Sequence, residues 1–207
     1  MTTLKARLPV IAFVNAGDPD LRTTEALLRR LDALGVAGVE LCVPYADPYT
    51  DGATLRRSHA RALPQGVGLD EVLALVARLR PLLRLKVYLM ADWSHTVKPL
   101  GIDTFMARVA GAPVDGLLLH GLPPMVRARG EALAAAAGVA LVATVYLNGV
   151  ASALNDAAAA RAALSDETAA RAALSDEAAA RAALSDAAAS RAAFVYLVAQ
   201  YGPAGSH

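Results

Sequence analysis

Short strand-like apolar runs alternate with helical segments along most of the chain, and this alternation constrains the fold more than any other feature. The run at 9–15 ends in the turn cluster Ala16-Gly17-Asp18-Pro19, and leucines then recur at helical spacing as far as Gly35. Strands alternating with helices of this length predict right-handed βαβ units and a parallel sheet, an α/β class. Further strands are predicted at 39–43, 85–90, 114–120, 139–146 and 194–199, and helices at 69–79, 101–110 and 124–137.

Composition excludes several classes of protein. The 207 residues carry 20 Lys+Arg against 19 Asp+Glu, so the chain has no basic surface of the kind that binds nucleic acid. The single cysteine, Cys42, excludes a disulfide scaffold and a cysteine-based zinc cage, and favours a reducing, cytoplasmic setting. The stretch 132–155 is uncharged, but Gly138 divides it into an Ala-rich half and a β-branched half. A buried helix followed by a strand explains that pattern better than a membrane span.

A ten-residue unit recurs over 155–194, beginning NDAAAARAAL and continuing SDETAARAAL. Twenty of these forty residues are alanine, so the segment is predicted to be helical. A ten-residue period matches neither the heptad nor the eleven-residue repeat, which excludes a sustained coiled-coil seam. We interpret 155–194 as a solvated helical insertion within a single barrel-like domain, 1–207, the alternative being a partner-binding arm. Without the repeats the core would hold about six βα units, short of the roughly 250 residues of an eightfold barrel.

Candidate reactive groups follow from a rule of parallel α/β folds, in which chemistry takes place at the carboxyl ends of the strands. Glu40 lies inside the apolar strand at 39–43, where burial of a carboxylate is costly. Burial would raise its pKa and suit it to acid–base work near neutral pH, the alternative being a structural glutamate. Asp47 and Asp51 flank Pro48 in the next loop, where turn formation and capping compete with function. His120, at a strand end, is assigned a structural role, and no metal site is predicted.

Four segments resemble one known family. VELCVPYADPYTDG (39–52) resembles the LELGVPFSDPxADGP signature of the tryptophan synthase α subunit, and FVNAGDP (13–19) resembles its first-strand FVTAGDP. GIDTFMARVAGAPVDGLLL (101–119) resembles its third helix and fourth strand, and YLVAQYGPAG (196–205) resembles more weakly its YxxSRxGVTG. The segments occur in the family's order, so the chain is identified as a member, truncated after about six βα units.

The resemblance implies a TIM barrel that cleaves indole-3-glycerol phosphate to indole and glyceraldehyde 3-phosphate, a retro-aldol reaction without a cofactor. Glu40 falls on the family's acid–base glutamate and Asp51 on the aspartate that accepts the indole N–H. Two carboxylates in different environments suit such a reaction. Pro44 and Asp47 fall on the loop that signals to the family's β-chain partner. Residues expected near the substrate are Tyr196, Gly202, Gly205 and Ser206.

The chain departs from the family pattern at several positions that would contact substrate. Ala91 replaces an aromatic residue after Met90, and Gly121 replaces an acidic one. The loops after strands seven and eight, whose backbone N–H groups hold phosphate in the family, have no counterpart here. Two other readings therefore stay open: an inactive paralogue that binds a β chain, and a decayed gene product. Further departures are Ala53, Ala199, Gln200 and Ala204.

Overall fold

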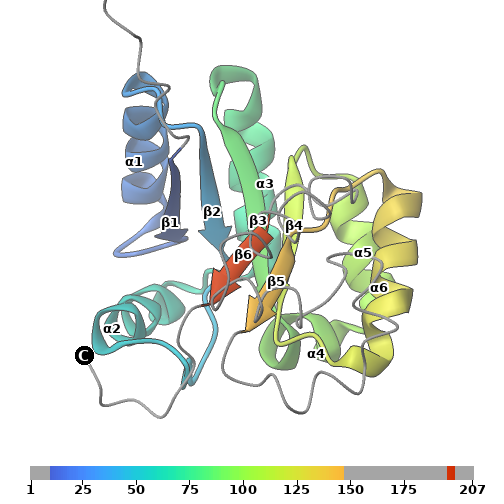
Figure 1. Cartoon of the computed structure of the whole chain (residues 1–207). Coiled ribbons are helices and arrows are strands. Elements are labelled where there is room, and N and C mark those ends of the chain that lie inside the picture. Colours follow the sequence, from blue (N-terminus) through green and yellow to red (C-terminus); the bar gives the residue numbers. More distant parts are fainter. Residues whose placement is uncertain (1–9, 147–194, 199–207) are drawn as a thin grey trace, which may run out of the picture.

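The computed structural model of the chain describes residues 10–146 and 195–198. Strands and helices alternate along it (Figure 1). Short 3-10 turns follow α2 and α3, and a π-helical turn, Trp93–Val97, follows β3. The elements are β1 (Ile11–Asn15), α1 (Leu21–Ala33), β2 (Gly38–Cys42), α2 (Ala53–Ala62), α3 (Leu69–Leu79), β3 (Lys86–Asp92), α4 (Lys98–Leu100), α5 (Ile102–Ala110), β4 (Gly116–His120), α6 (Pro124–Ala137), β5 (Ala143–Tyr146) and β6 (Val195–Val198).

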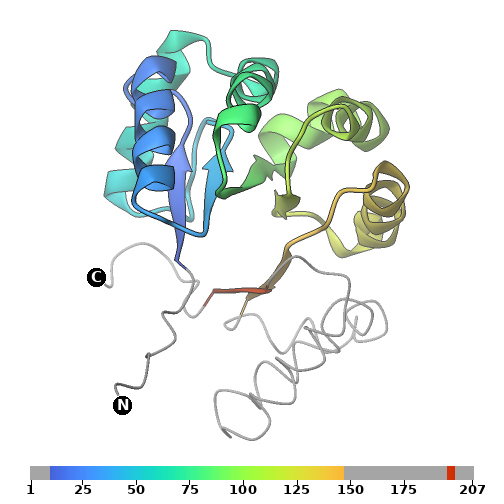
Figure 2. The ribbon, with the colours of Figure 1, turned by 90° about the horizontal axis from the view of Figure 1, so that it is seen from above.

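The described strands are parallel and follow one another in chain order. β1, β2, β3 and β4 form one sheet, and β5 pairs with β6. The backbone of Leu117 in β4 links the two sets, because its N–H donates to the carbonyl of Ala140 and its carbonyl accepts from the N–H of Val142, both at 2.8 Å. Seen from above, the strands follow an arc, with α1, α3, α5 and α6 on its outer side (Figure 2). The predicted α/β class with six βα-type strands is confirmed, and the arc is part of a TIM-type barrel.

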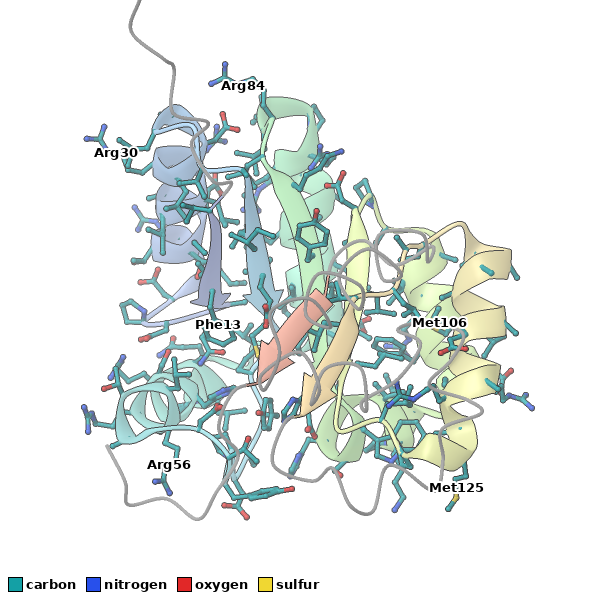
Figure 3. All side chains as sticks on the ribbon, viewed as in Figure 1. Phe13, Arg30, Arg56, Arg84, Met106 and Met125 are labelled. Carbon is teal, nitrogen blue, oxygen red and sulfur yellow. The ribbon has the colours of Figure 1, made fainter. Side chains whose placement is uncertain are left out.

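The two faces of the arc have different chemistry. Alternate strand residues such as Val39, Leu41 and Leu89 are fully buried against the outer helices. Phe105 and Met106 of α5 complete this apolar layer (Figure 3). The intervening residues face the inside of the arc, where Cys42, Met90, Leu118 and Val142 form a second, smaller cluster. The inner face is therefore the side on which polar strand residues converge.

Several local predictions change in the structure. α2 begins directly after Gly52 and fills most of the span between the predicted loop and α3. β3 runs to Asp92, two residues beyond its predicted end. His95 lies in the π-helical turn, because the Asp92 carboxylate accepts its backbone N–H at 2.9 Å and caps the turn. Gly138 ends α6 in the left-handed conformation (φ 68°), as expected for a glycine dividing helix from strand.

Some predictions fall outside the described residues. These are the Ala-rich repeats at 155–194 and the residues Gly202, Gly205 and Ser206. Tyr196 lies on β6, where its backbone is in register with Thr144 of β5. The single domain over 1–207 stays a prediction. In the part of the chain that the structure describes, no helix combines the length and the apolar character needed to cross a membrane.

Candidate active site

Parallel register stacks the inward-facing side chains in layers. Phe13, Glu40 and Tyr88 are register partners on β1, β2 and β3, and they form the first layer, which is nearer the amino ends of the strands. Two positions further along each strand, Asn15, Cys42 and Met90 form the next. Register partners on parallel strands point to the same face, so both layers look into the arc. In Figure 3, Arg30 and Arg84 lie at the end of the molecule where the strands begin. Arg56 lies at the opposite end, where the strands finish.

Glu40 is the buried carboxyl group of the first layer, and it is 4% exposed. Burial raises its pKa from 4.5 to about 7, because the charged form loses its hydration. The Tyr88 ring lies on the adjacent strand and fills the space above two glycines: a Cβ on Gly38 or Gly116 would come within 3.1 or 2.8 Å of it. Burial also raises the pKa of Tyr88. The expected burial of Glu40 and the rise of its pKa are both present, and its role as an acid–base group stays a prediction.

The charges of three carboxylates act on the Cys42 thiol. Burial, followed by the charges of Asp51, Glu40 and Asp92, raises the pKa of this thiol well above its usual value. Asp51 comes from the loop after β2 and Asp92 from the end of β3, so three separate segments direct their negative charge to one point of the inner face. The thiol stays protonated and apolar in this setting. The chemistry of the site is therefore that of carboxyl groups.

Asp51 lies beside a buried histidine of α2. The Nδ1 atom of His59 accepts the backbone N–H of Tyr45 at 3.1 Å, so the ring's proton lies on Nε2. That Nε2 is 3.3 Å from Oδ2 of Asp51, at an angle outside hydrogen-bonding geometry. His59 is 1% exposed, and Asp51 is 20% exposed, so the carboxylate lies between a buried N–H and the open side of the site. The two acidic groups thus have unlike environments, Glu40 apolar and Asp51 beside a donor.

An aromatic stack covers the carboxyl ends of the strands. The buried Tyr45 ring meets His59 edge-on, with centroids 4.5 Å apart, and stacks on His95 at 5.5 Å and His120 at 6.5 Å. Asp92 accepts from Nδ1–H of His95 at 2.7 Å, which orients that ring. Burial lowers the pKa of His120, while the charges of Asp92 and Asp51 oppose the shift. In the described residues, no group of three His, Cys, Asp or Glu side chains is arranged to hold a metal ion.

The loop after β1 is fastened to α2, and this fixes the wall of the site. Asp18 accepts from Ser58 Oγ and from the Arg61 guanidinium, each at 2.6 Å, and these bonds lower its pKa. Gly17 has φ +83°, and its N–H donates to Thr24 Oγ1 at 2.9 Å. A Cβ at Gly17 would come within 2.7 Å of Val67, so a larger residue is excluded there. The FVNAGDP segment therefore forms the end of β1 and a turn that is fastened to α1 and α2.

The predicted site residues fall into the carboxyl pair, the loop residues after β2, and the residues assigned to the substrate. Glu40 and Asp51 converge on Cys42, while Pro44 is buried directly after β2 and Asp47 is exposed with φ 52°. The roles of Tyr45 and His59 depend on a contact between separate segments, and the Asp92 cap on a local turn, so none of them was predicted from the sequence. For Tyr45 and Asp92, proximity to a predicted strand end was the available signal. The remaining predicted site residues are those named above as outside the described residues, and Tyr196.

The chain is similar to one known protein family in both sequence and structure. The sequence model of the family described as "Tryptophan synthase alpha chain" matches residues 2–163, which is more than half of the chain. The chain belongs to this family. Its first-strand and second-strand motifs, and the sites of Glu40 and Asp51, all lie within the matched residues.

Relatives in the family match the same portion of the chain. The tryptophan synthase alpha chain of Picosynechococcus sp. is 46% identical over 114 residues, which cover 55% of this chain and 43% of that protein. The one from Geotalea daltonii is 37% identical over 133 residues, covering 64% and 50%. The matched segments thus span about half the length of these relatives. A structure of the tryptophan synthase complex from Pyrococcus furiosus superposes with a TM-score of 0.64 at 30% identity, covering 72% of this chain and 61% of that one.

Proposed function

We propose that the chain is a carbon–carbon lyase of the tryptophan synthase alpha type, which cleaves indole-3-glycerol phosphate to indole and glyceraldehyde 3-phosphate. The observation that carries the proposal is the pair of unlike carboxyl groups on one inner face. Glu40 has its pKa raised to about 7 by burial, and Asp51 lies beside the N–H of His59. Family membership supplies the reaction class.

Each carboxyl has one task in this mechanism. Glu40, protonated in a large fraction near pH 7, gives its proton to the ring carbon that carries the side chain. Asp51 accepts the indole N–H and stabilises the positive charge that develops on the ring nitrogen. The bond between ring carbon and side chain then breaks, the electron pair returns to the ring, and the side-chain hydroxyl becomes the aldehyde. The Glu40 carboxylate takes up the proton which that hydroxyl loses, so the proton balance closes.

The proposed reaction uses no cofactor. It needs residues that bind the substrate and its phosphate, and a surface that binds a partner chain. We assign Tyr196, Gly202, Gly205 and Ser206 to the substrate, with the three residues near the C-terminus nearest the phosphate. We assign the loop that holds Pro44 and Asp47 to the binding of a tryptophan synthase β chain. Asp47 supports this because it is exposed with a left-handed backbone, whereas Pro44 is buried and could act only by shaping the loop. A second candidate function, an inactive partner of the β chain, needs this surface and not the carboxyl pair.

Indole release from indole-3-glycerol phosphate tests the proposal, measured with and without a β subunit. Glu40→Gln should lower the turnover at least about 100-fold, the range for loss of a general acid, and Asp51→Asn should also lower it. Glu71→Gln is the matched control, because Glu71 is exposed and glutamine keeps the cap bond to the Gly68 N–H. A thermal melt followed by circular dichroism shows that each variant is folded.

The two candidate functions give opposite results. If the folded chain releases no indole but still activates a β subunit, and Glu40→Gln does the same, the second candidate function is correct. Full indole release by Glu40→Gln refutes the assignment of the acid.

A further inference from the structure

Asn15, the last residue of β1, has a buried side-chain amide without a use in the fold. Its Oδ1 and Nδ2 have no hydrogen-bond partner among the described residues, and the residue is 5% exposed. Burying an amide without partners costs free energy, so nearly all buried polar groups are paired. An orphaned donor and acceptor on one side chain therefore indicate a missing ligand group.

Asn15 is not required for the turn that follows it. The Ala16 N–H already donates to the Cys42 carbonyl at 3.0 Å, and Thr24 and Asp18 fasten the loop through their own bonds. The neighbouring Val14 faces the outer apolar layer, so the Asn15 side chain faces inward. The amide is thus available to whatever occupies the inner face.

The position of Asn15 relative to the carboxyl pair is fixed by register. Asn15 is level with Cys42, the thiol on which Glu40, Asp51 and Asp92 converge. Phe13, two residues nearer the start of the same strand, is level with Glu40. A ligand that reaches Glu40 from the carboxyl ends of the strands therefore passes the amide of Asn15.

We propose that Asn15 is a substrate-positioning residue, whose side-chain amide hydrogen-bonds a hydroxyl of the three-carbon side chain of the substrate. The proposal rests on the proposed function. A carboxamide donates and accepts at once, and a hydroxyl is the substrate group that does the same. Indole offers only one N–H besides its apolar ring, and a phosphate oxygen only accepts. Holding the hydroxyl at this level fixes the breaking bond beside Glu40.

Asn15→Leu tests the proposal, because leucine keeps the size of the side chain and removes both polar atoms. Two ligands are compared by calorimetry: indole-3-glycerol phosphate under single-turnover conditions at low temperature, and 3-(indol-3-yl)propyl phosphate, which lacks the hydroxyls. We expect affinity for the hydroxylated ligand to fall about tenfold or more, one hydrogen bond's worth, and affinity for the deoxy ligand to stay unchanged. The melting temperature without ligand should rise by about 2 to 4 °C, since an unpaired amide is removed.

Thr24→Val is the matched control, because it removes a buried polar group that has a structural partner, the Gly17 N–H. It should lower the melting temperature and leave the ratio of the two affinities as in the parent. An Asn15→Leu chain that fails to fold, melts lower, or loses affinity equally for both ligands would give Asn15 a structural role and overturn the inference only. A folded parent that binds neither ligand overturns the proposed function, and the inference with it.

Discussion

Replacing Glu40 by glutamine should stabilise the folded protein above neutral pH and leave its stability unchanged in acid. Burial raises the pKa of Glu40 from 4.5 to about 7, so the folded chain holds this proton over a range in which the unfolded chain has released it. The contribution of Glu40 to the free energy of unfolding therefore falls as the pH rises from about 4.5 to about 7, and this contribution is flat outside that window. A span of about 2.5 pH units corresponds to about 3 kcal/mol. Glutamine, which does not ionise, avoids this loss.

Urea denaturation of the parent and of Glu40→Gln at a series of pH values between 4 and 8 measures this difference. The two free energies of unfolding should agree near pH 4 and separate by about 3 kcal/mol at pH 8, with Glu40→Gln the more stable. Glu71→Gln should follow the parent across the whole range, because Glu71 is exposed. Parallel curves for Glu40→Gln and the parent would show that Glu40 ionises as freely in the folded chain as in the unfolded one. Glu40 would then not be an acid poised near neutral pH.

Two further substitutions test the packing around the site. Phe105→Ala empties a fully buried position between α5 and the sheet and should cost about 3–5 kcal/mol in urea denaturation; a loss under 1 kcal/mol would refute the packing described. His59→Phe keeps the aromatic contact with Tyr45 but leaves the Tyr45 N–H without its acceptor, which should cost about 1–3 kcal/mol. The same variant should lower indole release with Glu40 intact, and unchanged release would remove His59 from the support of Asp51.

The fold could be predicted largely from local pattern. Apolar runs with helical segments between them define β1 to β4, and their predicted ranges agree with the structure to within a few residues. The disagreements have local causes that involve contacts. A polar helix at His59 is predicted by the sequence and confirmed as α2, but the burial of His59 is seen only in the structure. The turn at Trp93–Val97 depends on the Asp92 cap.

The candidate site could be predicted only in part. Glu40 was identifiable because a carboxylate within an apolar strand is rare, and Asp51 because of the family motif. Asn15 and Tyr45 stand at predicted strand ends, where reactive groups are expected, but nothing in the sequence singles them out there, and His59 lies on a helix. A tyrosine, a histidine on a polar helix and an asparagine at a turn are each ordinary in sequence, and their meaning comes from what they contact or fail to contact.

By itself, the sequence determined the alternation of strands and helices, the parallel sheet and the identity of the two carboxyl groups. Those properties depend on residue order and on side-chain periodicity, which are local. The tertiary structure alone decided that the charges of Glu40, Asp51 and Asp92 act on the buried Cys42 thiol and that the buried Asn15 amide is unpaired. Electrostatic and hydrogen-bonding environments depend on distances between segments far apart in the chain, and folding sets those distances.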